Sequence, residues 1–268
     1  MSDLELHTLP DEEYFAAPRA SNSLLSELRK SPAHLQHAIA HPPEPTPAMR
    51  LGTAFHVATL EPRNFDESWV RGSELSGRTK EGKAARAELE EKYDFDKILK
   101  PDDYDTVCEM RESVLTHPVA SDLLQGVDTE VAAFWTDEES GIECKAKVDG
   151  LPTDGDYLID LKSTIDASPD HMAKAIANLG YARQAAHYLN AFEDRDRFLI
   201  IAVEKKPPFA LAMYEISQAA IQHSASEVQR LLHLWERCID GFGWDKPWPS
   251  YTPDGITELD LPAWAYTQ

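Results

Sequence analysis

The residues best suited to chemistry lie in one short segment, residues 147–163, which holds Asp149, Asp160 and Lys162. Between the two carboxylates stands Asp154-Gly155, a strong signal for a two-residue type I′ turn that joins two β-strands. If this turn closes a hairpin, the numbers of directly opposed residues add up to 309, which places Asp149 opposite Asp160. We therefore expect their Cβ atoms about 4.5–5.5 Å apart on one face.

Two directly opposed carboxylates destabilise a sheet unless a cation lies between them, and a divalent metal ion is the obvious candidate. Side chains alternate along a strand, so Lys162 projects on the same face as Asp160 while Leu161 points into the core. Oxygen ligands for Mg²⁺, a polarised phosphate, a bound water of lowered pKa and a nearby amine are what phosphodiester hydrolysis requires.

A simpler interpretation stays open for the hairpin taken alone. It could be a surface hairpin with solvated lysines and aspartates, because Asp-x-Lys triplets are common. A bulge at Pro152 would also shift the register and separate the two carboxylates.

The elements that must position the hairpin follow from hydrophobic periodicity and from helix-ending and turn residues. A short helix follows Ser21-Asn-Ser23 and ends at Pro32, residues 42–47 form a loop, and a buried helix carrying His56 spans 49–60. The further expected elements are charged helices at 79–93 and 103–116, three strands within 130–163, helices at 168–179 and 181–192, strands in RFLIIAVEK and FALAMYEI, and a helix from 217 to about 239.

This order predicts an α/β fold with a central mixed β-sheet flanked by helices. We expect residues 1–268 to form a single domain. Its N-terminal helix and Pro-rich loop occupy 1–48, its core 49–240, and a Trp/Pro-rich tail 241–268.

The composition limits the function classes. A formal net charge of −21 argues against a nucleic-acid partner unless basic residues are segregated. One such group precedes the acidic stretch 88–105 and consists of Arg78, Lys80, Lys83 and Arg86, although an ordinary solvated helix face would look the same.

Cysteines and hydropathy exclude other classes. Three scattered cysteines speak against a disulfide framework, a zinc site or an iron–sulfur cluster. The sequence has neither a long apolar run nor a secretory signal at its start, so we expect a cytoplasmic protein without a membrane partner.

Four segments resemble the RecE-type exonucleases (exodeoxyribonuclease VIII-like) of the PD-(D/E)XK nuclease superfamily, and the resemblance covers most of the chain. They are SNSLLSELRKSPAHL, LGTAFHVATLEP, CKAKVDGL with YLIDLKST, and GYARQAAHYL. The last is similar to the Q-x-x-x-Y motif of nucleases related to the RecB nuclease domain. The resemblance implies the PD-(D/E)XK nuclease fold.

It also implies a role for each matching residue. Asp149, Asp160, the Leu161 carbonyl and His56 would bind the metal, and Lys162 would be the catalytic lysine.

Gln184 and Tyr188 would support the site or the DNA, although one turn of a helix that merely packs on the sheet would also place them on one face. Tyr181 and Glu130 are weaker candidates for a place near the substrate and the metal, and Tyr181 could equally pack on the core.

The chain departs from its relatives at two points. It lacks the four cysteines of relatives that carry an iron–sulfur cluster, and Val148 stands where the family's nominal motif has proline.

Mg²⁺ is the expected cofactor, with Mn²⁺ at least as effective because it accepts imidazole. The implied substrate is a linear double-stranded DNA end, degraded 5′ to 3′ to leave a 3′ overhang for recombination.

A ring-shaped homo-oligomer, trimer or tetramer, would combine an acidic exterior with a basic channel. A single-strand annealing protein is the implied partner, and the tail segment LDLPAWAYTQ could dock it, contact another subunit or simply pack on the domain. A PD-(D/E)XK endonuclease or repair nuclease and a non-catalytic acidic DNA mimic are the alternatives.

Overall fold

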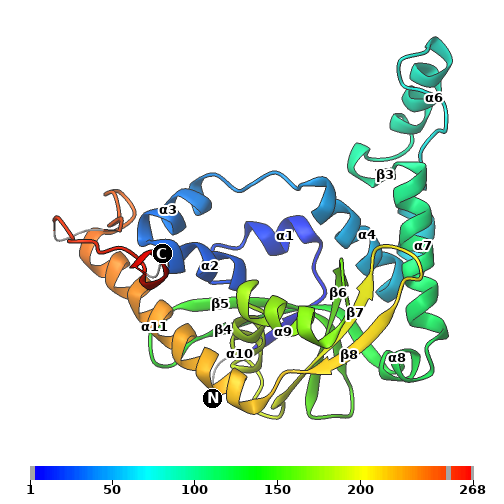
Figure 1. Cartoon of the computed structure of the whole chain (residues 1–268). Helices are drawn as coiled ribbons and strands as arrows, with labels where there is room; N and C mark the ends of the chain where they lie inside the picture. Colours follow the sequence, from blue (N-terminus) through cyan, green and yellow to red (C-terminus); the bar gives the residue numbers. More distant parts are fainter. Residues whose placement is uncertain (1–3, 252–254, 267–268) are drawn as a thin grey trace.

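The computed structural model describes residues 4–251 and 255–266, and the six-stranded sheet in them is mixed, as predicted (Figure 1). Its strand order is β1-β4-β5-β6-β7-β8, and only β6 and β7 are parallel. The strands are β1 (Glu5–His7), β4 (Val127–Thr136), β5 (Glu143–Pro152), β6 (Tyr157–Thr164), β7 (Arg197–Glu204) and β8 (Leu211–Glu215). A two-stranded parallel sheet pairs β2 (Val70–Arg71) with β3 (Ile98–Leu99).

Most helices of the described residues pack around this sheet (Figure 1). The helices are α1 (Asp11–Ala16), α2 (Asn22–Lys30), α3 (Pro32–Ala40), α4 (Pro47–Leu60), α5 (Pro62–Ser68), α6 (Lys80–Glu90), α7 (Pro101–Thr116), α8 (Pro118–Leu123), α9 (Pro169–Asn178), α10 (Tyr181–Leu189) and α11 (Gln218–Phe242), with 3₁₀ turns at Phe95–Lys97 and Ala263–Tyr266. None of them is long and apolar enough to cross a membrane.

Local sequence explains the starts of several helices. The Ser21 side chain accepts a hydrogen bond from the Leu24 amide at the start of α2, and Thr46 does the same for Met49 at the start of α4. Proline in the first turn begins α3 and α4, where its missing N–H costs no hydrogen bond.

Two cores lie on opposite faces of the sheet. On one face, α2, α10 and α11 cover Trp135 and Phe198, while on the other α4 and α7 cover Leu161 and Ile201. Strand β6 serves both cores because its side chains alternate, and Leu161 is fully buried as predicted.

The first 48 residues contain more structure than the predicted helix and loop. Strand β1 pairs with β4 at the sheet edge, α1 covers that pair, and α3 starts at Pro32, directly where α2 ends. The sequence signal of β1 was too short to detect, since the strand has three residues. Pro32 marks the end of α2, as predicted, but it also begins α3, because proline favours the first turn of a helix.

The predicted type I′ turn at Asp154-Gly155 is wrong. Gly155 has a φ of 150°, and Asp154 is not among the described residues with positive φ, whereas a type I′ turn needs left-handed φ at both positions. The loop is held by its neighbours instead, since Thr153 bonds to the Gly126 carbonyl and the Asp156 carbonyl accepts from Arg197.

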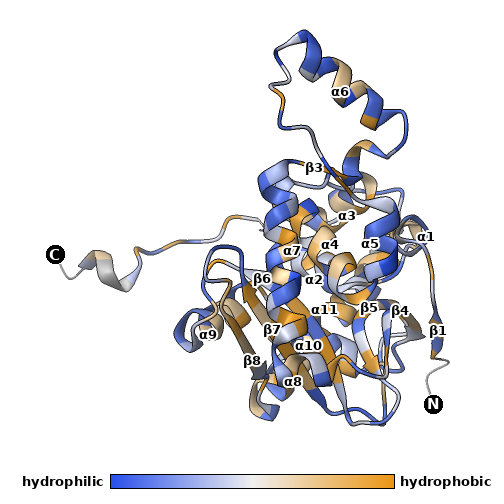
Figure 2. Ribbon diagram, turned by 90° about the vertical axis from the view of Figure 1, so that its right-hand side faces the viewer, coloured by the Kyte–Doolittle hydropathy of each residue, from blue (hydrophilic) through white to orange (hydrophobic). Residues whose placement is uncertain are grey.

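An arm projects from the body between β2 and β3 and comprises residues 72–97, including α6 (Figures 1 and 2). The guanidinium groups of Arg50 and Arg86 each lie 5.2 Å from the centroid of the Phe95 ring. Arg50 also pairs with Asp96 at 2.6 Å. The base of the arm is therefore fixed to α4.

The C-terminal tail packs on α3 in its first part. Trp248 is buried, its backbone amide donates to Gln36 Oε1, and Gln36 Nε2 donates to the Lys246 carbonyl. Farther on, Leu259 and Leu261 are exposed. Residues 267–268 of the segment LDLPAWAYTQ lie outside the described residues.

Candidate active site

Three neighbouring strands place three carboxylates in one row. Gly150 pairs with Ile159, which is the predicted register and puts Asp149 opposite Asp160. The pairs of β4 and β5 on either side put Glu130 opposite Asp149. Glu130, Asp149 and Asp160 therefore follow one another across β4, β5 and β6.

Glu130 has an unusual backbone conformation. Its φ is 54°, in the left-handed region that a non-glycine residue rarely adopts, and the ladder between Thr129 and Val131 is interrupted there. Val127 packs in the core under α4 and α7, whereas Val131 packs in the opposite core, although regular alternation would put both on one face. The strand thus turns over at Glu130.

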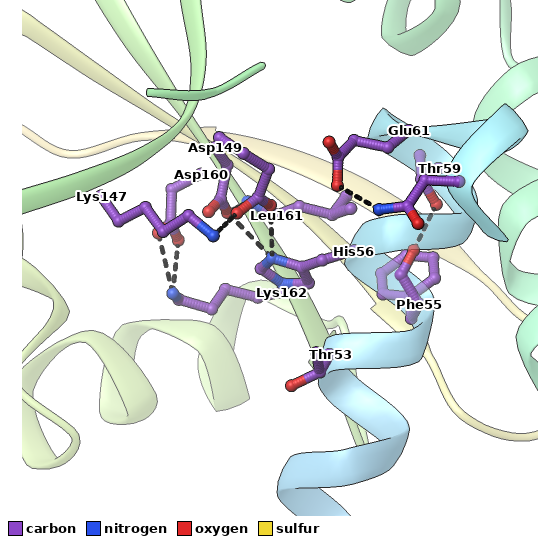
Figure 3. Close-up of polar contacts among 12 residues, drawn as sticks. Thr53, Phe55, His56, Thr59, Glu61, Lys147, Asp149, Asp160, Leu161 and Lys162 are labelled. Atoms are coloured by element: carbon purple, nitrogen blue, oxygen red, sulfur yellow. Dashed lines mark hydrogen bonds and ion pairs between the residues drawn. The ribbon is translucent and has the colours of Figure 1, made fainter. Parts of the chain in front are cut away.

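His56 reaches this turning point from α4. Its Nδ1 lies 3.5 Å from Asp149 Oδ2 (Figure 3). The same Nδ1 lies 4.0 Å from Glu130 Oε1. One ligand atom each from His56, Glu130 and Asp149 lie within 4.8 Å of one another, a spacing that suits one metal ion. Their side chains remain 11% to 24% exposed, so an ion could enter from solvent.

Asp160 is held by other partners. Both of its oxygens lie 2.8 Å from Lys162 Nζ, and Gln184 Nε2 donates to Oδ1 at 2.7 Å. Asp160 is therefore adjacent to the trio of His56, Glu130 and Asp149 but not part of it in this structure. Its carboxylate instead holds the Lys162 ammonium.

Leu161 contributes its backbone. Its amide donates to Asp149 Oδ2 at 2.7 Å, which replaces a ladder hydrogen bond where β5 and β6 separate. The amide and the carbonyl of one strand residue point to the same side, so the Leu161 carbonyl also faces β5 beside Asp149. This orientation suits the ligand role implied by the family resemblance.

The pKa values of the three acids are shifted in different directions. Burial raises the pKa of Glu130, and the neighbouring Asp149 charge adds to it. Burial also raises the pKa of Asp160, against the attraction of Lys162. For Asp149 the effect of burial is outweighed by His56, so its pKa is lowered.

The bases are held in their charged forms by the acids. Burial alone would lower the pKa of His56, but the charge of Asp149 and its hydrogen bond raise it to about 9. Likewise, the charges of Asp160 and Asp149 raise the pKa of Lys162 against burial. The site without an ion therefore consists of carboxylates balanced by cations.

Helix α10 supports the site through the face that carries Gln184 and Tyr188. Burial raises the pKa of the Tyr188 hydroxyl strongly, and a backbone hydrogen bond from Lys147 opposes this shift. Gln184 thus contacts β6 and Tyr188 contacts β5. At the start of α10, the Tyr181 ring centroid lies 5.0 Å from Lys162 Nζ, a cation–π contact.

The predicted basic residues lie on the arm, away from this cluster (Figure 1). Arg86 pairs with Glu90 at 2.6 Å, whereas Arg78, Lys80 and Lys83 are exposed and form no ion pair with another described residue. The base of the arm nevertheless lies near the cluster, because Arg50, which contacts the arm, precedes His56 on α4 by six residues, about 9 Å of helix.

Sequence reasoning overlooked Lys147 as a site residue. Its Nζ lies 2.6 Å from Glu130 Oε2, and its side chain is 19% exposed. The alternation of β5 puts Lys147 on the face of Asp149, but the same spacing is compatible with a solvated lysine, so the sequence alone does not single it out. Glu130, treated as a weak candidate, lies in the centre of the cluster.

The donor set fits a divalent ion with mixed ligands. Two carboxylates and one imidazole suit Mn²⁺ and tolerate Mg²⁺, whereas no described cysteine lies among them to favour a softer metal.

Comparisons with known proteins agree with this fold. The family model of a PDDEXK-like domain of unknown function (DUF3799) matches residues 21–249. A crystal structure from Eubacterium rectale, named "Putative exonuclease", aligns with a TM-score of 0.58 at 13% identity, covering 97% of this chain and 98% of that chain.

A second structure, SSO0001, is 15% identical with a TM-score of 0.30, and the alignment covers 55% of this chain and 67% of that chain, which is too weak a likeness to interpret. No curated protein matches the sequence significantly.

Proposed function

This chain belongs to the DUF3799 family of PDDEXK-like domains, within the PD-(D/E)XK nucleases, and we propose that it is a metal-dependent exonuclease acting on double-stranded DNA. One observation carries the proposal: His56, Glu130 and Asp149 converge within 4.8 Å beside the ion-paired Asp160 and Lys162. A structural ion-pair network would not need an imidazole, a strained glutamate and a positioned lysine in one place.

Each residue has a distinct role in this proposal. His56, Glu130 and Asp149 hold the ion, with Asp160 and the Leu161 carbonyl as further ligands. A bound divalent ion supplies polarisation of the phosphate and a bound water of lowered pKa. Lys162, directed by Asp160, orients the attacking water or neutralises the charge that develops on the phosphate. Gln184 fixes Asp160, and Tyr188 supports β5.

The nature of the ion follows from the ligands. Mg²⁺ strongly prefers oxygen, whereas Mn²⁺ also accepts imidazole. We therefore expect both ions to support cleavage, with Mn²⁺ at least as effective.

The exonuclease assignment, with 5′ to 3′ polarity and 3′ overhangs for strand annealing, is supported by the RecE-type sequence segments. The name of the Eubacterium rectale structure points to the same activity class. A single nuclease domain that forms a trimeric or tetrameric ring and works with a single-strand annealing protein completes the proposal.

The arm is the proposed DNA contact outside the site. Arg78, Lys80 and Lys83 are solvent-exposed cations that form no ion pair with another described residue, in a chain of net charge −21. Such segregation is what an acidic protein needs to bind phosphates. The base of the arm at Arg50 puts these cations on the α4 side of the site.

Digestion of a linear duplex labelled separately at each 5′ and 3′ end, beside a covalently closed circle, tests the proposal. Release of 5′ nucleotides with Mg²⁺ or Mn²⁺ but not with chelator, while the circle stays intact, is the expected result. Cutting of the circle would indicate an endonuclease. No cleavage with any metal would favour a DNA mimic.

A lysine variant ties the activity to this site. Lys162→Met should reduce the cleavage rate by about 10²–10⁴-fold, the usual contribution of a positioned proton-transfer or charge-stabilising group. Lys174→Met, at an exposed position of α9, is the matched control and should leave the rate unchanged. Unchanged cleavage by a folded Lys162→Met protein would contradict the assignment.

A further inference from the structure

Every carboxylate of the site has its own cation. Asp160 is paired with Lys162 and Asp149 with His56, while Lys147 Nζ lies 2.6 Å from Glu130 Oε2. The pair of Lys147 and Glu130 is mostly buried, with exposed fractions of 19% and 13%. Two lysines pair with carboxylates of the site, and the proposed function assigns a role to Lys162 but none to Lys147.

Glu130 faces two positive positions at once. Oε2 is bound to Lys147, and Oε1 points toward His56, on the side where a metal ion would be shared with Asp149. An ion bound to Glu130 and the Lys147 ammonium would be separated by little more than one carboxylate group. In a partly buried site their repulsion is weakly screened, so the two cations compete for Glu130.

We propose that Lys147 is the built-in counter-ion of the metal site, and that metal binding displaces it from Glu130 toward the DNA phosphate. This inference rests on the proposed metal-dependent nuclease function. Without the ion, Lys147 compensates the charge of a glutamate that is placed opposite Asp149. With the ion bound, the charge of Glu130 is compensated by the ion, and the Lys147 ammonium can exchange Glu130 for another anion.

The position of Lys147 suits that second role. It precedes Asp149 by two residues on β5, so it lies on the same face of the strand, while Lys162 occupies the corresponding face of β6. Figure 3 shows both lysine side chains reaching toward the carboxylates from the strands. A phosphate bridging to the ion would therefore lie within reach of both ammonium groups.

Metal binding without DNA tests the inference by a readout other than activity. In titration calorimetry with Mn²⁺ at pH 8, Lys147→Met should bind the ion about tenfold more tightly than the parent, because a competing charge is gone. Lys147→Arg keeps the charge and should bind like the parent. Lys174→Met is the control for loss of a lysine elsewhere. If Lys147→Met fails to fold, Lys147→Gln takes its place.

Cleavage at saturating Mn²⁺ tests the second part of the inference, the transfer of Lys147 to the DNA phosphate. Lys147→Met should cut DNA at least about tenfold more slowly and with a raised KM, although its metal affinity is higher. Equal or weaker Mn²⁺ binding by Lys147→Met would overturn the counter-ion role. Tighter binding with unchanged cleavage would overturn the transfer to phosphate.

The two proposals fail separately. If the parent binds Mn²⁺ but cuts no DNA, the nuclease function is wrong, while the calorimetric comparison still decides the counter-ion role. If the parent cuts DNA and Lys147→Met shows no gain in affinity, the inference alone is wrong.

Discussion

At the scale of single residues, the site combines a strained backbone with buried charge. A left-handed conformation at a non-glycine residue costs on the order of 1–2 kcal/mol, and Glu130 adopts it where its side chain meets His56 and Asp149. The strand turns over at this residue, which directs its carboxylate into the row of acids. The strain therefore serves the geometry of the site rather than the stability of the fold.

Two substitutions at Glu130 separate the backbone strain from the role of the side chain in metal binding. Glu130→Gly should have a free energy of unfolding about 1 kcal/mol higher than Glu130→Ala, because glycine adopts a φ of 54° without a steric penalty. Both should lose metal binding. Denaturant unfolding with calorimetry measures the two effects.

The control is the exposed neighbour Asp128, which is not among the described residues with positive φ. There the order should reverse, with Asp128→Ala more stable than Asp128→Gly by about 0.5–1 kcal/mol. The same order at both positions would contradict the strain at Glu130.

The lowered pKa of the buried His187 predicts how the free energy of unfolding depends on pH. His187 is fully buried with Nε2 3.2 Å from the Ala20 and Lys145 carbonyls, and burial lowers its pKa to about 4. Since the unfolded imidazole titrates near 6.5, its contribution to stability is complete above that pH. It is lost as pH falls toward 4, by about 3 kcal/mol in total.

The prediction is tested by the slope of unfolding free energy against pH between 6.5 and 4. His187→Gln, whose amide can still donate to a carbonyl, should show a flatter slope than the parent. His223→Gln, on the exposed face of α11, should keep the parental slope. Equal slopes for both variants would refute the role of His187.

At the scale of elements, the hairpin shows what the sequence could predict. Alternation and spacing correctly placed Gly150 opposite Ile159, although the turn that justified the register is not of type I′. The register survives because one face of each strand is committed to a core, so a slip of one residue would expose Leu161. The helix that carries His56 was predictable because its apolar residues also recur at the spacing of one buried face.

Other parts of the site could not be derived from local patterns. The central place of Glu130 depends on a φ angle that no propensity signals. The ion pair of Lys147 with Glu130 joins β5 to β4, and the bond of Gln184 to Asp160 joins α10 to β6. Such contacts depend on how separate elements pack, which spacing within one element does not determine.

The arm is the element whose charge can be tested independently of the chemistry. Changing Lys80 and Lys83 together to glutamine should weaken DNA binding and reduce the slope of log K against log salt by about 2, because two phosphate contacts are lost. Mn²⁺ affinity should not change.

Replacing Lys174 and Lys246, two exposed lysines elsewhere, is the matched control. An unchanged salt dependence in the Lys80 and Lys83 double variant would remove the arm from the proposed DNA interface.

At the scale of the whole molecule, charge is the dominant property. With 47 acidic and 26 basic side chains, the net charge of a single subunit disfavours approach to DNA. A ring in which several arms face one channel would concentrate the exposed cations of each arm, Arg78, Lys80 and Lys83, around the duplex. The proposed assembly thus resolves the conflict between an acidic chain and a polyanionic substrate.

Light scattering after size exclusion measures the assembly directly. We expect a mass three or four times that of the 30.1 kDa chain. A monomer at micromolar concentration, with and without DNA, would contradict the ring. The measurement also guides the salt experiment, since an assembled ring would multiply the contacts of each arm.

The pairing of β2 with β3 at the base of the arm allows the arm to vary in length and sequence. Val70 pairs with Ile98 and Arg71 with Leu99, so the chain leaves and re-enters the body at adjoining points, about 4.8 Å apart. A segment inserted in this way can be lengthened, exchanged or removed without opening either core. In the proposed function, DNA binding by the arm and bond cleavage at the site would therefore lie in separable modules, and we expect a shorter loop grafted between Arg71 and Ile98 to keep the chemistry while changing the choice of DNA.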